Sequence, residues 1–325
     1  MTTATSRSIR PFVDGDADYA ALAALQALVY PDYPFSAAEI RHDDETWDHA
    51  KHFKRRWVLE ADSAVVGWVQ TNHARSSFVP TTYWLDLGVR PDARRRGHGS
   101  ALYEHALRAL RERGASRIRS GTKETMADGV AFLARHGFVE AKRDWESRLF
   151  LRDFDFARFA GARERVEGQG IRISTLKEEL TRDGDAARKG FDLTDEIHND
   201  VPSMDAPTPL DFETWKKRTL EGPNSLNEAY FLAIDASGRW LGLSELERSA
   251  DDPSFLWQGL TGTRRDARGR GIAMALKLET VRFARERGVE HIKTWNDQRN
   301  RPMLAINEAL GYVKQPAWIQ FQKDL

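Results

Sequence analysis

Residues 89–102 read VRPDARRRGHGSAL, and residues 264–276 read RRDARGRGIAMAL. Each stretch joins an apolar run to a helical pattern of hydrophobic residues, and each crowds arginines and glycines into the junction. A helix start leaves about four backbone N–H groups without intrahelical partners and carries partial positive charge. The sequence therefore predicts two equivalent anion-binding loops, each after a strand and before a helix.

The two stretches belong to a longer internal repeat. A shift of 174 positions aligns residues 89–139 with residues 263–313 without a gap, and 17 of the 51 positions are identical. The glycines that would end the two helices, Gly114 and Gly288, also coincide. We therefore interpret the chain as a duplicated domain.

Each copy follows the same order of expected elements. Helices come first, three strands rich in β-branched and aromatic residues follow, and the arginine–glycine loop then opens a further helix. A short strand, another helix and a last strand complete the copy. Residues 153–170 are charged and glycine-bearing, which predicts a linker. The expected fold is α+β, with domains at residues 1–152 and 171–325, each a mixed sheet flanked by helices.

Composition limits the classes of function. A length of 325 residues suits two domains, and 41% hydrophobic with 30% charged residues is typical of a globular protein. The 49 basic and 49 acidic residues balance, so we expect neither nucleic acid nor a membrane surface as a partner. The absence of cysteine excludes disulfides and thiolate ligands. With no apolar signal region in the first residues, we expect a cytoplasmic protein; no pattern indicates an oligomeric state.

The loops do not fit two common phosphate-binding patterns. Neither copy ends in the Gly-Lys-Ser/Thr of the Walker motif. The dinucleotide pattern needs a third glycine or alanine, where these copies have Leu102 and Met274. An arginine-rich solvated turn would explain one copy, but two copies at the same place in a repeat favour a ligand site.

Both loops resemble the signature R/Q-x-x-G-x-G/A of the GNAT acetyltransferase superfamily, which here reads Arg94-x-x-Gly97-x-Gly99 and Arg268-x-x-Gly271-x-Ala273. A Gly-aromatic pair that follows the next helix in each copy also matches: Gly137-Phe138 and Gly311-Tyr312. The resemblance implies two tandem GNAT-like domains, each with a mixed, largely antiparallel twisted sheet. It also implies acetyl-CoA as the cosubstrate and an amine as the acceptor.

The resemblance assigns the cosubstrate to defined residues in each copy. The loop and the helix start would hold the pyrophosphate, and backbone N–H groups of the preceding splayed strand would hold the thioester carbonyl. In the first copy these residues are Leu87, Val89, Arg94, Arg95, Arg96, Gly97, His98, Gly99 and Ser100. In the second they are Thr261, Thr263, Arg268, Gly269, Arg270, Gly271, Ile272 and Ala273.

The usual acid of the superfamily is missing. A tyrosine normally stands four residues before the Gly-Phe glycine, where this chain has Leu133 and Asn307. Asparagine can donate a hydrogen bond to sulfur but cannot deliver a proton. Asn296 and Asn300 join Asn307 as expected cosubstrate contacts of the second copy, although Asn300 before Arg-Pro also fits a helix cap.

Candidates for the base lie on the strand expected around residues 240–247. Alternation places Leu241, Leu243, Glu245 and Glu247 on one face, so that the two glutamates follow an apolar stripe. A solvent-exposed strand end is the plainer interpretation. In the first copy Asp86 lies on the splayed strand, where it fits either a catalytic or a structural carboxylate.

Residues 193–207, LTDEIHNDVPSMDAP, carry acidic groups that fit either an amine-attracting surface or a solvated loop. The leading hypothesis is an acetyl-CoA-dependent N-acetyltransferase for a small primary amine, in which the second copy is the catalytic half and Glu245, Glu247 and Asn307 act in catalysis. The alternative is a non-catalytic acyl-CoA-binding or sensing protein. An RNA-binding protein is disfavoured by the zero net charge.

Overall fold

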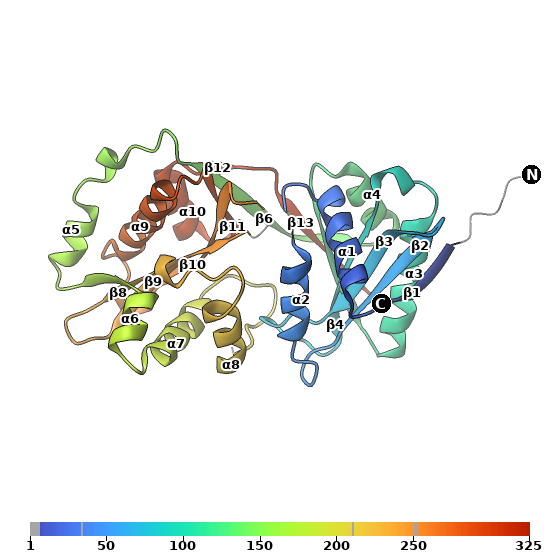
Figure 1. The fold of residues 1–325 in the computed structure, drawn as a ribbon, viewed down its shortest axis with the longest axis horizontal. Helices are drawn as coiled ribbons and strands as arrows, with labels where there is room; N and C mark the ends of the chain where they lie inside the picture. Colours follow the sequence, from blue (N-terminus) through green and yellow to red (C-terminus); the bar gives the residue numbers. More distant parts are fainter. Residues whose placement is uncertain (1–6, 34, 210, 250–251) are drawn as a thin grey trace, which may run out of the picture. The chain divides into compact units, whose positions relative to one another are not determined.

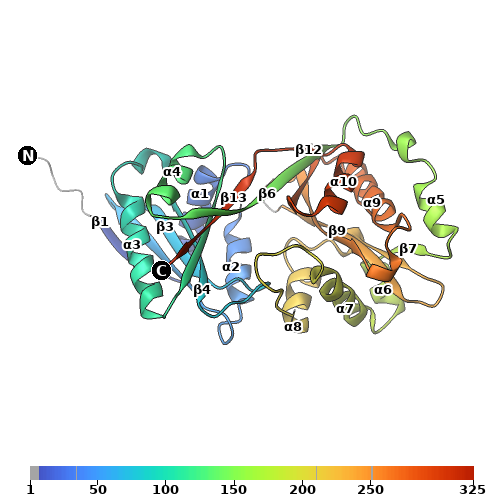
Figure 2. The ribbon, with the colours of Figure 1, turned by 180° about the vertical axis from the view of Figure 1, so that it is seen from behind.

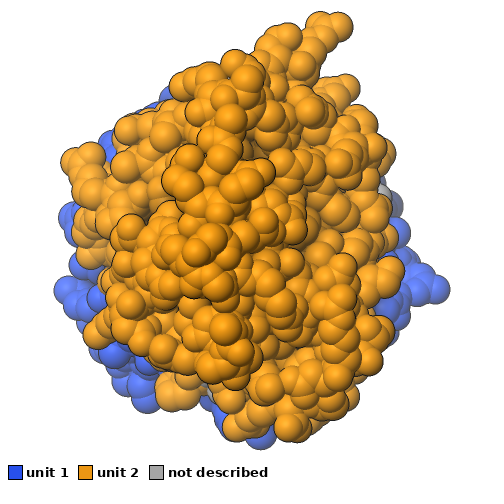
Figure 3. All heavy atoms as spheres, turned by 90° about the vertical axis from the view of Figure 1, so that its left-hand side faces the viewer, with its two compact units in different colours: residues 1–143, 204–208, 318–325 blue, residues 144–203, 209–317 orange. Residues whose placement is uncertain are grey.

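The computed structural model describes residues 7–33, 35–209, 211–249 and 252–325. They form two compact units (Figure 3). Unit 1 comprises Met1–Arg143, Met204–Thr208 and Trp318–Leu325, and unit 2 comprises Asp144–Ser203 and Pro209–Ala317. Both are sheets flanked by helices, which confirms the α+β class.

The sheet of unit 1 is mixed. Its strand order is β1 (Arg7–Pro11), β2 (Lys54–Ala61), β3 (Ala64–Asn72), β4 (Thr82–Val89), β5 (Arg117–Lys123) and β13 (Trp318–Asp324). All neighbours are antiparallel except β4 and β5. The cluster that contains Leu85 and Leu102 buries residues of α3 (His98–Glu112) and α4 (Ala127–Arg135). The cluster around Trp68 buries α1 (Asp16–Val29) and α2 (Ala37–Glu45).

Unit 2 repeats this arrangement. Its strand order is β6 (Val139–Phe150), β11 (His291–Asp297), β10 (Phe255–Thr263), β9 (Trp240–Arg248), β8 (Tyr230–Ile234) and β7 (Arg172–Thr175), and β12 (Val313–Lys314) also pairs with β6. Its longer helices are α6 (Leu176–Arg182), α7 (Ala186–His198), α9 (Ile272–Glu286) and α10 (Arg301–Leu310). The short α8 (Phe212–Trp215) continues into a π-helix, Lys216–Leu220.

The last strand of each copy pairs within the unit of the other copy. In Figure 1 the red β13 lies among the blue and cyan strands of unit 1, where it pairs with β5. The green β6 lies beside the orange β11, and Asp144–Phe150 pair with it in unit 2. The boundaries of the compact units therefore differ from those of the sequence repeat. Strand pairing depends on backbone hydrogen bonds, which β6 and β13 can supply equally well to either sheet.

The expected linker is part of the core of unit 2. Within it, α5 (Ala162–Glu167) is helical, and Phe154, Ala162 and Val166 are buried in the cluster that contains α9. Apolar residues spaced along a charged segment thus dock on the unit instead of spanning open solvent.

In both units the central parallel strands are paired at one end only. The paired residues are Thr82–Trp84 with Arg117–Arg119 in unit 1, and Phe255–Trp257 with His291–Lys293 in unit 2. Beyond them β4 and β10 run on toward the arginine–glycine loops. This confirms the order of these strands and loops along the chain that the repeat predicted. In the part of the chain that the structure describes, no helix is long and apolar enough to cross a membrane.

Candidate functional site

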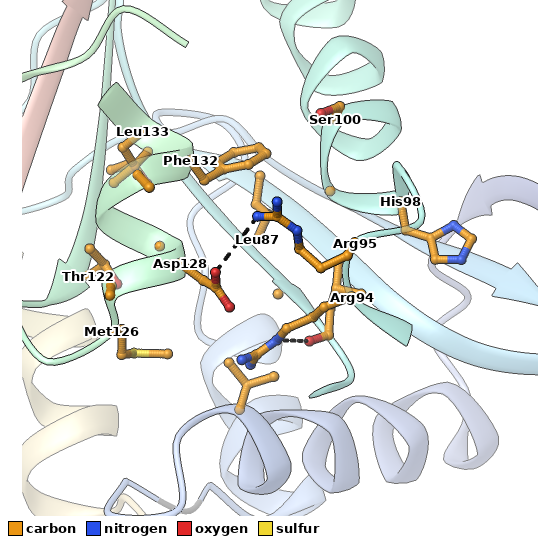
Figure 4. A pocket seen from close by; sticks show the side chains of 18 of the residues that line it. Leu87, Arg94, Arg95, His98, Ser100, Thr122, Met126, Asp128, Phe132 and Leu133 are labelled. Atoms are coloured by element: carbon orange, nitrogen blue, oxygen red, sulfur yellow. Dashed lines mark hydrogen bonds and ion pairs between the residues drawn. The ribbon is translucent and has the colours of Figure 1, made fainter. Parts of the chain in front are cut away.

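A cavity of about 730 Å³ opens in unit 1 where β4 and β5 diverge. It is bounded by the end of β4, the arginine–glycine loop, the start of α3 and one side of α4 (Figure 4). The expected residues Leu87, Val89, Arg94, Arg95, Gly97, His98, Gly99 and Ser100 line it. The structure therefore brings the first predicted set together around one hollow, except for Arg96, which does not line the cavity and donates to the carbonyl of Asp92.

The loop of unit 1 presents positive charge with few competing anions. Gly97, with φ of 79°, directly precedes α3 and has no side chain that can cap the helix, so the first N–H groups of α3 have no capping side chain at the end that lines the cavity. Arg94 Nε donates to the carbonyl of Val89 at 3.1 Å, and Arg95 lies 3.9 Å from Asp128. Figure 4 shows Arg95 extending toward α4, whereas His98 points the other way. The residues fit an elongated ligand that carries phosphate groups.

The loop of unit 2 has the same backbone but a different electrostatic environment. Gly271, with φ of 82°, directly precedes α9, as Gly97 precedes α3. Its arginines, however, pair with acidic residues: Arg265 and Arg268 both donate to Asp200, and Arg264 pairs with Glu196. The charge of this second loop is therefore largely compensated within the protein.

These ion pairs occupy three carboxylates of the stretch 193–207, for which the sequence left an amine-attracting surface and a solvated loop both open. Glu196 and Asp200 bind the loop arginines, and Asp205 pairs with Arg119 in unit 1. Arg265, followed by Arg268, holds the pKa of Asp200 below its usual range. Long-range charge pairing of this kind leaves no periodic signal in a sequence.

Glu245 lies at an irregularity of the sheet in unit 2. The β9–β10 register shifts between Gln258 and Thr261, and Glu245 Oε1 accepts a hydrogen bond from the Leu260 N–H at 3.0 Å. A Cβ on Gly259 would lie 2.8 Å from the Glu245 side chain, so glycine makes room for it. Burial, reinforced by the charge of Glu247, raises the pKa of Glu245 to about 8. Such a carboxyl exchanges protons near neutral pH.

The predicted alternation on β9 holds only in part. Leu241 packs into the core cluster with α9, whereas Leu243 packs into the other cluster with α7, so the two leucines do not share a face. The cause is a register irregularity between β8 and β9 at Ala233 and Ile234. Glu245 shares the face of Leu243, and Glu247 is exposed near the strand end.

The three asparagines of unit 2 take different positions. Asn307 is 2% exposed, and its Nδ2 donates to Asn296 Oδ1 at 2.6 Å. Its Oδ1 is buried without a hydrogen-bond partner among the described residues. The free group of Asn307 is thus an acceptor, not the donor we expected. Asn300 caps α10 by accepting the Met303 N–H, as the capping alternative predicted.

Sequence reasoning missed Tyr30 and Phe132, which line the cavity in unit 1. Thr122, Met126 and Leu133, which the repeat aligns with the three asparagines of the second copy, line it as well, and Leu133 stands at the place of the superfamily's usual acid. Tyr30 follows α1 directly and continues that helix's apolar stripe, so periodicity alone marks it as core.

Comparisons with known protein sequences agree with the loop resemblance. Residues 22–138 match the model of the Acetyltransferase (GNAT) family. The mycothiol acetyltransferase of Thermomonospora curvata is 28% identical over 237 residues, which are 73% of this chain and 72% of the relative. The mycothiol acetyltransferase of Catenulispora acidiphila is 23% identical over 285 residues, 88% of this chain and 84% of the relative.

Solved structures share the whole architecture. A tandem GNAT protein from the clavulanic acid biosynthesis pathway has a TM-score of 0.74 at 19% identity, with 98% of each chain covered. A GCN5-related N-acetyltransferase from Sphaerobacter thermophilus has a TM-score of 0.69 at 22% identity, and the match covers 98% of this chain and 95% of the chain in that structure. The fold is therefore that of two tandem GNAT domains.

Proposed function

We propose that this chain, an acyltransferase with two tandem GNAT domains, moves the acetyl group of acetyl-CoA to a primary amine of a small molecule in the cytoplasm. We further propose that unit 2 is a catalytic half, with Glu245 as the base. The observation that carries this assignment is the half-buried Glu245, whose carboxylate accepts the Leu260 N–H and whose pKa is raised to about 8. A base is most effective when its pKa lies near the working pH.

Acetyl-CoA would supply the acetyl group as a thioester, and no protein nucleophile is needed for transfer to an amine. In this proposal Gly271 and the first turn of α9 hold the pyrophosphate, while the N–H groups of Thr261 and Thr263 polarise the thioester carbonyl. Glu247, two residues further along β9, acts in this proposal through its charge, which helps to raise the pKa of Glu245.

The test is a screen of small primary amines with acetyl-CoA, in which products are identified by mass spectrometry. We expect an acetylated product whose rate of formation falls at least 100-fold in Glu245→Gln. Glu213→Gln, which changes an exposed carboxylate of the same unit, is the matched control and should keep the rate. Full activity of Glu245→Gln would remove Glu245 from the mechanism.

A non-catalytic acyl-CoA-binding protein remains the second candidate. It is favoured by Leu133, which cannot donate a proton, and by Asn307, whose amide donor is already used by Asn296. Tight CoA binding without an acetylated product from any amine of the screen would support this candidate over the transferase.

A further inference from the structure

A set of buried polar side chains joins helix α9 to the strand that carries Glu245. Gln258 on β10 donates through its Nε2 to Ser244 Oγ at 3.2 Å and to the Glu245 carbonyl at 2.6 Å. Its Oε1 accepts at 3.0 Å from the hydroxyl of Thr280 on α9, which also contacts the Lys277 carbonyl at 2.8 Å. Ser244, Gln258 and Thr280 are at most 6% exposed. Both ends of the Gln258 amide are therefore held in the interior of unit 2.

Gln258 stands at one edge of the sheet irregularity that serves Glu245. The β9–β10 register shifts between Gln258 and Thr261. The two residues between them, Gly259 and Leu260, form a bulge opposite the single residue Glu245, and a bulge leaves backbone groups without their ladder partners. Here the Leu260 N–H bonds to the Glu245 carboxylate, and the Glu245 carbonyl accepts the Gln258 amide. The Gln258 side chain thus replaces a bond that the bulge removes from the ladder.

The other edge of the bulge is held by the same hydroxyl of β9. Thr261 Oγ1 lies 2.9 Å from Ser244 Oγ, and because that serine oxygen accepts the Gln258 amide, its proton can bond to Thr261. On the side of β11, Thr294 Oγ1 donates to the Gln258 carbonyl at 3.4 Å. The residues before and after the bulge are therefore both tied to Ser244.

The network lies on the face of the sheet opposite to the Glu245 carboxylate. The helices α9 and α7 lie on opposite sides of β9 (Figure 2). Thr280 belongs to α9, whereas the Glu245 side chain shares the face of Leu243, which packs with α7. Gln258 can therefore influence the carboxylate through the backbone of the bulge, and not by contact with it.

In the strand pairs that the structure describes, unit 1 has neither the bulge nor these polar side chains. Its β3–β4 register runs without a shift along the whole pair. The counterparts in unit 1 are all hydrophobic: Trp84 for Gln258, Leu87 for Thr261, Ala106 for Thr280, and Val69, the β3 partner of Leu87, for Ser244. Buried polar groups cost stability unless each is paired. Their presence in the unit that holds Glu245 therefore points to a role in placing that carboxylate.

We infer that Gln258 is a positioning residue, which with Ser244 and Thr280 fixes the bulge so that the Leu260 N–H meets the Glu245 carboxylate. The inference rests on the proposed role of Glu245 as the base and goes beyond it, because Gln258 acts through the backbone. The Leu260 N–H stabilises the ionised carboxylate and so opposes the rise in the Glu245 pKa that burial causes. Loss of the network lets the bulge relax, raises that pKa further and leaves less of the base ionised at neutral pH.

The charged and titratable groups around Glu245 are unchanged when Gln258 is replaced. Glu247 lies two residues further along β9, and its charge helps to raise the pKa of Glu245. Tyr230 lies directly across from Glu245 on β8, and burial together with the Glu245 charge raises the pKa of Tyr230. Arg218 of the π-helix places an opposite charge near Glu247. A shift in the titration of Glu245 therefore reports the state of the bulge.

The experiment measures kcat/KM against pH for the full chain, with acetyl-CoA and an amine that the screen identifies. Gln258→Met keeps the length of the side chain and removes its hydrogen bonds. The midpoint of the rising limb should move up by about one pH unit, and the rate at pH 7 should fall about tenfold, because a hydrogen bond to a charged group contributes about that much.

Three further variants separate positioning from a general loss of stability. Thr280→Val removes the hydroxyl that holds Gln258 and should shift the midpoint in the same direction, whereas Thr280→Ser keeps the hydroxyl and should retain the wild-type midpoint. Ser174→Ala is the control, because Ser174 on β7 is equally buried and bonds to Glu178 and Glu179. It should lower stability in urea unfolding and leave the midpoint unchanged.

An unchanged midpoint in Gln258→Met would overturn the inference and leave the proposed function intact, as long as Glu245→Gln loses the rate. If Gln258→Met does not fold, equal midpoints in Thr280→Val and Thr280→Ser would overturn it instead. A shift of the same size in Ser174→Ala would do so too, since it would trace the effect to stability. A chain that acetylates no amine, or a fully active Glu245→Gln, would remove the proposed function and this inference together.

Discussion

Replacement of Lys277 by methionine should stabilise the protein at neutral pH. Lys277 lies on α9 with 1% of its surface exposed, and in the described part of the chain its ammonium contacts the Tyr312 ring at 5.0 Å without a hydrogen bond or ion pair. Burial lowers its pKa from 10.5 to about 7. Methionine has a similar shape and no charge to desolvate, so Lys277→Met keeps the packing and removes the titration.

The size of the effect follows from the two pKa values. A difference of about 3.5 between the unfolded and folded pKa corresponds to about 5 kcal/mol, at about 1.4 kcal/mol for each pH unit. Between pH 7 and pH 10.5 the unfolded chain binds the proton and the folded chain does not, so wild-type stability from this group rises with pH. The advantage of Lys277→Met is therefore largest at or below pH 7 and is gone at pH 10.5.

Urea unfolding followed by circular dichroism, at several pH values from 7 to 10, measures this directly. The difference in unfolding free energy between Lys277→Met and wild type should shrink by about 1.4 kcal/mol per pH unit. Lys217→Met, at an exposed lysine of the same unit, should show no such slope. A constant difference across this range would show that Lys277 is not held neutral by burial.

Three further predictions concern the proposed sites. Because only the deprotonated form of a base accepts a proton, kcat/KM of unit 2 should rise with pH up to about 8, and Glu245→Gln should abolish that rise in a pH–rate profile. Gly97→Val and Gly271→Val replace glycines with φ near +80°, and each variant should bind one equivalent of CoA fewer than wild type in a calorimetric titration. An unchanged stoichiometry would refute the loop assignment. Asp200→Asn should strengthen CoA binding to unit 2 by up to about fivefold, since partly exposed ion pairs contribute at most about 1 kcal/mol; weaker binding would mean that Asp200 helps to hold the ligand.

The sequence predicted what depends on local pattern. Periodicity and turn glycines located both loops and the elements around them, because Gly97 and Gly271 have backbone conformations that other residues adopt at a cost. The short strands β1 and β7 and the helix α5 were not predicted. The sequence could not predict that β13 completes unit 1, because a strand's partner is chosen by packing over a long chain distance. Nor could it place Tyr30 on a cavity, since a residue that follows an apolar helical stripe looks like ordinary core.

The two units carry their carboxylates on different strands of the same local framework. In unit 1, Asp86 on β4 lies directly across from Gln70 on β3. The pairs Val89–Gly67 in unit 1 and Thr263–Gly242 in unit 2 are equivalent in the repeat. Three residues from each pair along the strands lie Asp86 and Gln70 in unit 1, and Leu260 and Glu245 in unit 2. Glu245 therefore corresponds to Gln70, and Leu260 to Asp86. The Glu245 side chain accepts the N–H of that same Leu260. Each copy therefore places one carboxylate at the same strand pair, on β4 in unit 1 and on β9 in unit 2, so the repeat keeps the position of an acidic group while the strand that carries it differs.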